Sequence, residues 1–393
     1  MVPGFVKRWV RARRQLPTTP VYGLGPAELR SSAKAPRALL SYITRPFRIT
    51  PRDPDNVRFS NIGIARGIVQ TLNELGYVVD VAEWEDTAFV PERRYALFVG
   101  HGGINFERIA RALGPETRRI YFSTGAYWRF HNEQELARVK ALNERRDAAL
   151  PPDRYIHYSE EWANENAEAI VCLGNESLRK TYGRFPSVRH LNNAAFPVRD
   201  GNHTRKYFAA ARRNFLFFAG GGNVHKGLDL LLEVFSRVDA HLWICQLLMP
   251  EFARTYRREL EELANIHYVG WVPVRSPEFR ALVERCAYTI LPSCSEGCAG
   301  SVVECMHHGL IPVVSRESFV ETSDYGITLR DCSIETIAQT VEELSQRPTG
   351  WLEEMSQQTL RAAESEFSES AFRGNLKVAL GGLFSPEMEQ RQA

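Results

Sequence analysis

The stretch of sequence that decides the fold runs over residues 214–232 and reads NFLFFAGGGNVHKGLDLLL. Its first part, 214–220, is apolar without polar alternation, which is typical of a strand covered on both faces of a parallel sheet. After the glycines, leucine and phenylalanine recur between residues 228 and 235 at the spacing of one helical face. A buried strand, a glycine loop and a helix in this order form the repeating unit of a doubly wound α/β domain.

The same alternation extends in both directions along the chain. Apolar strands are predicted at 38–44, 77–81, 96–99, 119–123 and 169–173 before this stretch, and at 241–246, 287–291 and 310–315 after it. Helices are predicted at 64–75, 105–113, 132–146 and 334–346, and from residues 176, 277 and 301 onward. The helix at 132–146 is expected to be exposed and charged. The predicted fold class is α/β, with two Rossmann-like doubly wound parallel-sheet domains facing each other across a cleft.

Length and composition support two domains. The chain has 393 residues, more than one hydrophobic core usually serves. Polar and basic residues at 198–213 mark the boundary. We therefore expect a tail and linker at 1–36, an N-terminal domain at 37–200, a C-terminal domain at 212–350 and C-terminal helices at 351–393.

Charge and cysteine content narrow the function classes. The formal net charge is only +2, which gives no overall field for nucleic acid, so no nucleic-acid partner is expected. The sequence holds no run of apolar residues long enough for a membrane span and no signal-peptide pattern. Seven cysteines, an odd number, favour free thiols in a reducing compartment. A cytoplasmic location is therefore predicted.

The N-terminal residues 1–14 carry five basic side chains beside Phe5, Trp9 and Val10. One interpretation is a solvated tail. The other is a short amphipathic anchor, which would place the protein peripherally at the inner face of an anionic membrane.

The glycine loop is a candidate phosphate site. The bare backbone of Gly220, Gly221 and Gly222 lies between a strand and a helix that begins near Gly227, where N–H groups and the helix dipole favour an anion. Lys226 adds a positive charge at the same place. A flexible turn with a solvated lysine is the alternative interpretation.

Two better-known phosphate motifs do not match this loop. A dinucleotide fingerprint requires a third glycine where His225 stands and an acid where the next strand ends in Gln246. A P-loop requires Ser or Thr after a Gly-Lys pair, whereas here Gly227 is followed by Leu228.

Two glutamates follow in the segment LPSCSEGCAGSVVECMHHGLIPVVS, residues 291–315. Glu296 belongs to a loop at the carboxyl end of a predicted strand. Glu304 falls in the first turn of the next predicted helix. Ser301 and Glu304 also have the spacing of a capping box, so Glu304 could serve the helix end as well as a ligand.

Together these motifs resemble a known family. The strand–GGGNVHKG–helix, the SEG-x-x-G-x-x-x-x-E pattern and GLIPVVS look like the C-terminal domain of retaining glycosyltransferase family 4, which has the GT-B fold. The stretch HLNNAAF at 190–196 resembles that family's interdomain segment. The similarity is specific over 214–346 and diffuse over 37–197.

The resemblance implies roles for individual residues. Lys226 matches the lysine that holds the donor diphosphate, Glu296 the glutamate at the reaction centre, and Glu304 the glutamate that holds the ribose hydroxyls. Gly297 and Gly300 would let the loop backbone approach the donor closely. The resemblance also implies that the last helices cross back to the N-terminal, acceptor-side domain.

The sequence departs from the family pattern at two places. The usual arginine, five residues before the lysine, is replaced by Gly221. We expect the backbone N–H groups of Gly220 to Gly222, together with His225, to replace the charge of that arginine in part. The usual histidine after the strand ending at Ser123 is missing, and His101 is the predicted substitute.

An acceptor platform is predicted from the aromatic residues Tyr127, Trp128 and Phe130 together with His131, because sugars stack on aromatic faces. A hydrophobic lid over the core is the alternative. No metal site and no cofactor are expected. Cys294, Cys298, Cys305, His307 and His308 lack the spacing of a zinc site.

These observations lead to three hypotheses. The first is a metal-independent retaining glycosyltransferase, of the hexosyltransferase type, that moves a sugar from a nucleotide-sugar donor to a glycan or lipid-linked acceptor of a polysaccharide pathway. The second is an inactive nucleotide-sugar-binding protein. The third is a sugar-nucleotide epimerase on the same fold.

Overall fold

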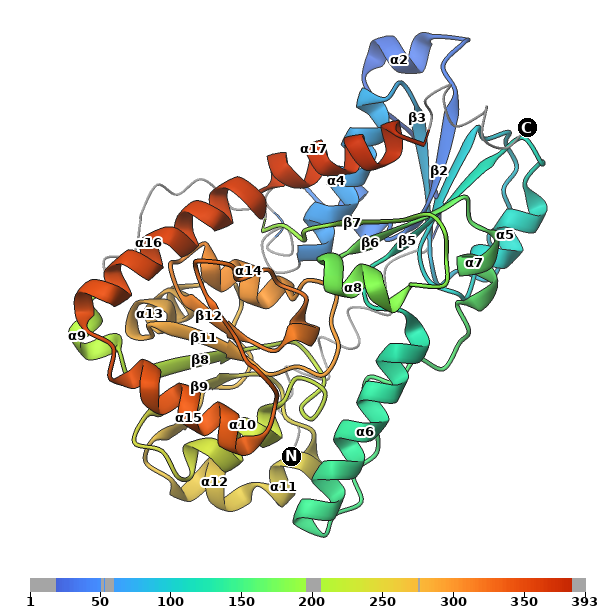
Figure 1. Cartoon of the computed structure of the whole chain (residues 1–393). Coiled ribbons are helices and arrows are strands. Elements are labelled where there is room, and N and C mark those ends of the chain that lie inside the picture. Colours follow the sequence, from blue (N-terminus) through green and yellow to red (C-terminus); the bar gives the residue numbers. More distant parts are fainter. Residues whose placement is uncertain (1–18, 51–52, 54–59, 196–205, 275, 384–393) are drawn as a thin grey trace.

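The computed structural model describes the chain except residues 1–18, 51–52, 54–59, 196–205, 275 and 384–393. The chain forms two α/β domains, each built on a twisted sheet with helices on both faces (Figure 1). The predicted fold class is therefore confirmed. The basic N-terminal segment and its membrane role lie outside the described residues. None of the helices in the described part of the chain is long and apolar enough to span a bilayer.

The N-terminal sheet has seven strands in the order β1-β3-β2-β4-β5-β6-β7. They are β1 (Val21–Leu24), β2 (Arg37–Tyr42), β3 (Val78–Glu83), β4 (Leu97–Gly100), β5 (Arg118–Ser123), β6 (Ala169–Leu173) and β7 (Val188–Leu191). All neighbours pair in parallel except β1, which pairs antiparallel with β3. The segment predicted as a linker therefore contributes an edge strand. The N–H of Gly23 in this strand also donates to the buried carboxylate of Asp80 at 2.7 Å.

Helices cover this sheet on both sides. The helices of this part of the chain are α2 (Ala27–Ser31), η1 (Arg45–Phe47), α4 (Ser60–Glu74), α5 (Phe106–Ala112), α6 (Trp128–Arg146), α7 (Glu161–Asn166) and α8 (Glu176–Thr181), of which α6 leaves the sheet. The side chain of Asn175 caps α8 by accepting from the N–H groups of Ser177 and Leu178.

The C-terminal sheet has six strands, all parallel, in the order β10-β9-β8-β11-β12-β13. They are β8 (Asn214–Phe218), β9 (His241–Cys245), β10 (Ile266–Tyr268), β11 (Tyr288–Leu291), β12 (Ile311–Val314) and β13 (Ile327–Thr328). The helices are α9 (Phe208–Ala211), α10 (Leu228–Phe235), α11 (Pro250–Thr255), α12 (Arg257–Glu262), α13 (Pro277–Arg285), α14 (Gly300–Met306), η2 (Arg316–Ser318) and α15 (Ile334–Ser345). The side chains of Ser276 and Ser333 cap α13 and α15 by accepting from the N–H groups of Phe279 and Thr336.

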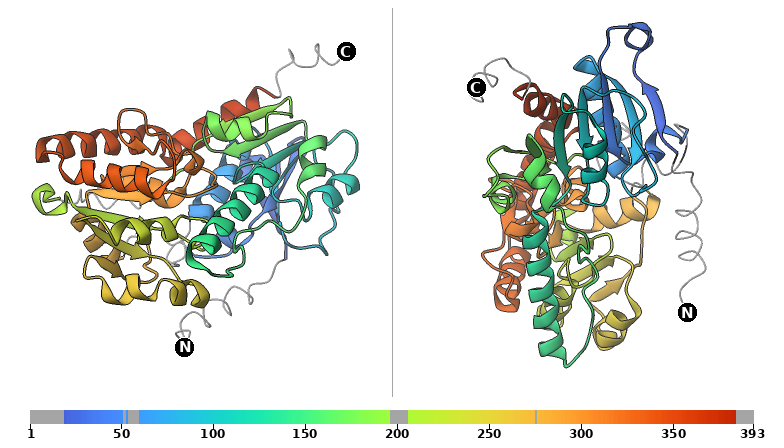
Figure 2. Two further views of the ribbon diagram at one scale, coloured as in Figure 1. Left: turned by 60° about the horizontal axis from the view of Figure 1, so that its bottom comes forward. Right: turned by 90° about the vertical axis from the view of Figure 1, so that its right-hand side faces the viewer.

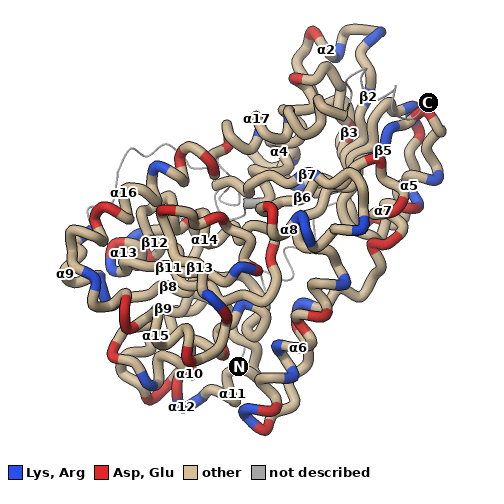
Figure 3. The backbone as a smooth tube through the Cα atoms, viewed as in Figure 1, with Lys and Arg blue, Asp and Glu red and all other residues tan. Residues whose placement is uncertain are grey.

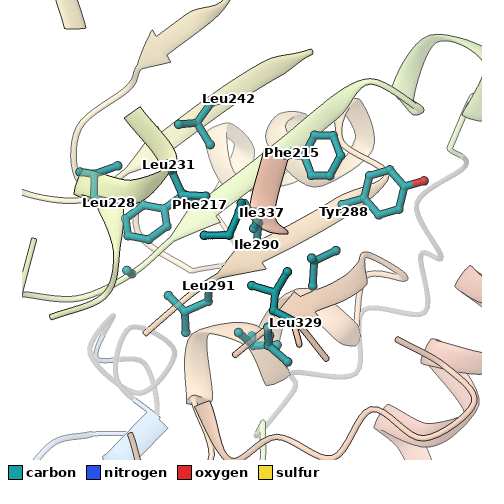
Figure 4. Packing of buried hydrophobic residues seen from close by; sticks show 14 of the residues in the cluster. Phe215, Phe217, Leu228, Leu231, Leu242, Tyr288, Ile290, Leu291, Leu329 and Ile337 are labelled. Carbon is teal, nitrogen blue, oxygen red and sulfur yellow. The ribbon is translucent and has the colours of Figure 1, made fainter. Parts of the chain in front are cut away.

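The core of this domain is formed by the apolar strands and the inner face of α10. Phe215 and Tyr288 stack with ring centroids 4.6 Å apart, and Leu231 and Ile337 pack above the sheet (Figure 4). These side chains are almost fully buried. Burial of this kind fixes β8 and β11, and their carboxyl ends then fix the loops that follow them.

Helix α6 is the main surprise of the fold. It starts in the N-terminal domain and runs along the C-terminal domain (Figures 1 and 2). Val139 and Leu142 belong to the hydrophobic core of the C-terminal domain. Arg145 and Arg146 form an ion cluster with three acids of that domain, Asp229, Glu233 and Glu259. The prediction of an exposed helix at this position was wrong, because its charges face partners that are distant in sequence.

The described part of the chain ends with two helices, α16 (Thr349–Glu366), which packs on the C-terminal domain, and α17 (Glu369–Gly381), which leaves it. Helix α17 lies against α4 of the N-terminal domain, as Figures 1 and 2 show. Phe372 packs on Gly67 of α4, and Arg373 pairs with Glu74 at the end of that helix. Basic and acidic residues alternate along the backbone of both domains (Figure 3), which agrees with the small net charge.

Candidate functional site

The site is built where β8 and β11 end. The glycine loop follows β8, and the loop 292–299 follows β11, so adjacent parallel strands bring the two loops together. Lys226 and Glu296 meet there as an ion pair, and the hydroxyl of Ser293 donates to the same carboxylate oxygen of Glu296 at 2.6 Å. The structure thus brings together two of the predicted catalytic residues, which are 70 positions apart in sequence.

The electrostatics of this pair follow from burial. Burial alone would raise the pKa of Glu296, but Lys226, His225 and the hydrogen bond from Ser293 lower it to about 2. Burial lowers the pKa of Lys226, and Glu296 opposes that effect. Glu296 is therefore a carboxylate near neutral pH, able to stabilise positive charge but not to donate a proton.

The glycine loop presents its backbone to the outside. Gly220 and Gly221 are exposed, and their N–H groups donate to no acceptor among the described residues. The N–H groups of Lys226, Gly227 and Leu228, in contrast, are bonded within the loop. The open donors are thus those of the loop rather than those of the helix end that the sequence suggested.

Two glycines are required by the backbone. Gly227, the residue before α10, has φ +81°, and a Cβ there would stand 2.5 Å from the carbonyl oxygen of Pro292. Gly222 has φ +98°. Both angles lie in the left-handed region that favours glycine. Gly227 therefore allows the two loops of the site to touch.

Asn223 and Gln246 hold the loop in shape, and no sequence pattern marked them as a pair. Asn223 donates to Gln246 at 2.7 Å and to the carbonyl of Leu247 at 3.0 Å, while Gln246 donates to the carbonyl of Gly220 at 2.5 Å. Both side chains are buried. Gln246, which follows β9, thus fixes the shape of the loop by donating a hydrogen bond to it. An ionised acid at this position has no N–H or O–H to donate and could not do the same.

His225 is placed differently from the prediction. It is buried, its Nδ1 lies 2.5 Å from a carboxylate oxygen of Glu135 in α6, and its Nε2 faces the carbonyl of Ser295. Both ring nitrogens are thus occupied within the protein, so His225 has no free N–H for a phosphate. It instead joins the glycine loop, the Glu296 loop and α6 of the other domain.

The loops of the two domains are in direct contact at Glu296. The N–H of Ala126 donates to the carbonyl of Glu296 at 3.1 Å. A Cβ on Gly297 would overlap the carbonyl of Thr124, so only glycine fits there. Asn193, from the stretch that resembles an interdomain segment, donates to the carbonyl of Cys298 at 3.0 Å. The N-terminal domain therefore positions the backbone of the loop that carries Glu296.

Glu304 is buried in α14, which starts at Gly300 directly after this loop. The residue before the first turn is Ala299 rather than Ser301, and no side chain caps the helix. The capping box suggested by the spacing of Ser301 and Glu304 does not form. The helix begins two residues earlier than the capping box required, so Glu304 lies in its second turn rather than its first.

His101 ends β4 on the side of the N-terminal domain that meets the Glu296 loop. Its Nδ1 donates to the carbonyl of Phe122 at 3.0 Å, and its ring lies edge-on to Tyr42 and Trp84. Burial lowers its pKa to about 4. The ring is therefore neutral near pH 7, and with Nδ1 donating, Nε2 is left as an acceptor.

The predicted acceptor residues do not form one open face. Tyr127 is buried and donates to Glu161 at 2.6 Å, and the indole of half-buried Trp128 donates to the same carboxylate at 3.3 Å. His131 is buried too, its ring centroid 4.8 Å from that of His225, and burial lowers its pKa to about 4. Phe130 is half-buried. The alternative interpretation, a hydrophobic layer over the core, describes Tyr127 better than a sugar platform does.

All seven cysteines lie in the described part of the chain and are free thiols, as predicted. Within that part, one group has metal-ligand geometry: Glu135, His225 and Cys294, whose candidate atoms lie within 4.8 Å of one another. Hydrogen bonds join His225 to Glu135 and to Ser295, and burial raises the pKa of the Cys294 thiol. In this structure hydrogen bonds occupy both ring nitrogens of His225, and the absence of a metal site stays a prediction.

Comparison with known proteins agrees with this geometry. Residues 212–347 match the family model described as glycosyl transferases group 1. The matched segment is the C-terminal domain that carries Lys226, Glu296 and Glu304. A search of curated protein sequences gives no significant match.

Solved structures share the fold at low sequence identity. Sucrose-phosphate synthase from Thermosynechococcus elongatus has a TM-score of 0.59 at 13% identity, covering 89% of this chain and 99% of that one. The lipopolysaccharide outer core galactosyltransferase WaaB has a TM-score of 0.59 at 11% identity, covering 88% and 99%. TarM has a TM-score of 0.52 at 13% identity, covering 72% of this chain and 54% of TarM, so this chain spans about half of that protein.

Proposed function

We propose that the protein is a retaining glycosyltransferase that moves a sugar, of the hexose type, from a nucleotide-sugar donor to a glycan or lipid-linked acceptor without a metal. The observation that carries the proposal is the Lys226–Glu296 pair at the mouth of an exposed glycine loop. The match of residues 212–347 to a glycosyltransferase family model supports it.

The donor diphosphate would bind at Lys226. A phosphate oxygen competes with Glu296 for the ammonium group, and the unbonded N–H groups of Gly220 and Gly221 add fixed donors. Glu304, one helix turn beyond the loop, is proposed to hold the ribose hydroxyls. Released from Lys226, the Glu296 carboxylate would face the sugar ring.

Transfer breaks the bond between C1 of the sugar and the diphosphate oxygen, and forms a bond from C1 to an acceptor hydroxyl on the same face. Negative charge grows on the leaving diphosphate, which Lys226 stabilises, and positive charge on the ring, which Glu296 stabilises. The hydroxyl proton passes to the departing diphosphate. His101 Nε2, a neutral acceptor on the other domain, is proposed to orient that hydroxyl. Fixed cations and N–H groups do this work without a metal.

The acceptor and the location are proposed from the relatives that share the fold and from the N-terminal sequence. WaaB, which shares the fold, is a lipopolysaccharide galactosyltransferase, and a mutant of S. aureus TarM has been solved with fondaparinux, alpha-GlcNAc-glycerol and UDP. We therefore propose an acceptor from a polysaccharide or lipopolysaccharide pathway. A cytoplasmic location, with peripheral contact at the inner membrane face through the basic residues of 1–14, would suit such an acceptor.

The first test is donor binding. Thermal shifts would be measured with nucleoside diphosphates and their sugar conjugates on wild type, Lys226→Ala and Glu296→Gln. Ligand at about 100 times its Kd should stabilise the wild type by roughly 2.7 kcal/mol. We expect one base to give this shift, Lys226→Ala to lose it, and Glu296→Gln to keep it while transfer falls by about 100-fold or more.

The product distinguishes the proposal from its alternatives. Retention predicts that the product keeps the donor's anomeric configuration, which NMR reads directly, and that turnover survives EDTA. Gly221 is the observation that favours an inactive binding protein, which would bind donor but release no sugar with any acceptor. An epimerase would change the donor sugar without an acceptor.

A further inference from the structure

Arg154 belongs to the N-terminal domain, in the loop after α6, and reaches the glycine loop of the other domain. The N–H groups of Asp153 and Arg154 donate to Glu135 at 2.9 and 3.0 Å, and the carbonyl of Arg154 lies 2.8 Å from Nε2 of His131. The carboxylate of Asp153 accepts from the N–H of Asn223 at 3.0 Å. The backbone at Arg154 is therefore held from both domains.

The side chain of Arg154 lies across Gly222. A Cβ added to Gly222 would stand 2.7 Å from Cγ of Arg154, which is closer than real contacts allow, and 3.1 Å from its Cδ, which is a tight contact. The missing side chain at position 222 thus leaves room for the aliphatic part of Arg154. Burial lowers the pKa of Lys226 most, and the charge of Arg154 lowers it further, so the two cations lie within electrostatic range.

The two cations differ in their acidic partners. Lys226 pairs with Glu296, whereas no acidic side chain in the described part of the chain lies within ion-pair distance of Arg154. The exposed N–H groups of Gly220 and Gly221 are unbonded at the same place. Two cations beside unbonded N–H groups favour a ligand with more than one negative charge.

We propose that Arg154 is the second phosphate-binding cation of the donor site, supplied by the N-terminal domain and acting with Lys226 on the diphosphate of the nucleotide sugar. The inference rests on the proposed function and deepens it, because it assigns the charge that Gly221 cannot provide. A guanidinium holds phosphate oxygens through two parallel N–H···O bonds. The donor therefore bridges the two domains, and its binding depends on the position of the loop after α6.

The test separates charge from packing. Arg154→Met keeps an unbranched stem over Gly222 and removes the guanidinium, and Arg361→Met on the exposed face of α16 is the matched control. Titration calorimetry would use UDP, GDP, ADP, inorganic pyrophosphate and the parent nucleosides. We expect Arg154→Met to raise the Kd of the bound nucleoside diphosphate and of pyrophosphate on the order of 10- to 100-fold. The nucleoside should bind as before, and Arg361→Met should match the wild type.

A second variant checks the same site from the other domain. A Cβ on Gly221 meets no atom within 4 Å, so Gly221→Arg can be accommodated. Added to Arg154→Met, it should recover diphosphate affinity at least in part.

The possible failures are distinguishable. If the wild type binds no nucleotide, the proposed function fails and this inference fails with it. If Lys226→Ala abolishes binding while Arg154→Met binds diphosphate like the wild type, only the assignment of Arg154 is overturned. Equal weakening of nucleoside and diphosphate would also overturn it, because Arg154 would then not act on the phosphates.

Discussion

At the scale of single residues, Lys226 and Glu296 form a buried ion pair that a phosphate group could break. A buried ion pair loses much of its attraction to desolvation, so it is a poor reason for keeping two charges inside a protein. A pair beside an exposed glycine loop has another use, because an incoming phosphate can replace the carboxylate at the ammonium group. The structure thus shows both groups paired with each other at the place where each would meet part of a donor.

The low pKa of Glu296 predicts a pH effect on stability. Its pKa in the folded chain is about 2, below the ordinary value of 4.5, so the ionised form stabilises the fold above about pH 4.5. This contribution is lost as the pH falls from 4.5 toward 2. Glu296→Gln should therefore reduce the stability lost between about pH 7 and pH 3.5, measured by urea unfolding at both values. An identical loss in wild type and variant would contradict the assigned ion pair.

The pairing of Lys226 with Glu296 could be predicted from sequence because both residues follow adjacent strands of one sheet. The hydrogen-bond partners of His225 could not be predicted from sequence. Glu135 lies 90 positions earlier, on a helix of the other domain, and nothing in either local pattern marks the contact. Arg154 was missed for the same reason, since it has no motif of its own and acts only through its place beside Gly222.

At the scale of elements, α6 shows how charge pattern can mislead. Its sequence is rich in Arg and Glu, which predicts a solvated face. In the structure, Arg145 donates to Asp229 at 2.6 Å and to Glu233 at 3.0 Å, and Arg146 donates to Glu259 at 2.9 Å. Most strands and the longer helices were predictable from periodicity, but the short elements β7, β10, α7, α11 and α12 were not predicted. The partner of an exposed-looking face depends on how the domains meet.

This contact predicts a cost for removing Arg145. Asp229 is fully buried, so Arg145→Ala would leave its carboxylate without its closest cation. We expect a loss of about 3 kcal/mol in the free energy of unfolding, measured by urea denaturation. The control is Arg257→Ala, whose ion pair with Glu261 is exposed on one helix and should leave stability unchanged. Equal effects of the two variants would mean that the ion cluster contributes nothing across the domains.

At the scale of the whole molecule, each domain contributes a helix that packs on the other domain. Helix α6 leaves the N-terminal domain and completes the core of the C-terminal one, while α17 follows the C-terminal domain and packs on α4 (Figures 1 and 2). Interfaces between domains in one chain are often small enough to allow independent motion. Here the exchange of helices connects the two domains at two places, and the proposed donor site lies where loops of the two domains meet.

The last prediction follows from this exchange. The wild type should unfold in one calorimetric transition, with the calorimetric enthalpy equal to the van't Hoff enthalpy. Phe372 is buried where α17 meets α4, so Phe372→Ala should cost about 3–5 kcal/mol at that contact. The double variant Phe372→Ala/Arg145→Ala weakens both contacts between the domains, at α17 and at α6. We expect its single unfolding transition to split into two.

The control for that experiment is Phe235→Ala. Phe235 is as buried as Phe372 but lies within the core of the C-terminal domain, so its loss should lower the melting temperature and leave one transition. If the double variant also unfolds in one step with equal enthalpies, the domains are coupled by contacts other than α6 and α17. The loops that meet at Gly297 and Thr124 would then be the remaining connection, and donor binding at the same loops should raise the stability of both domains together.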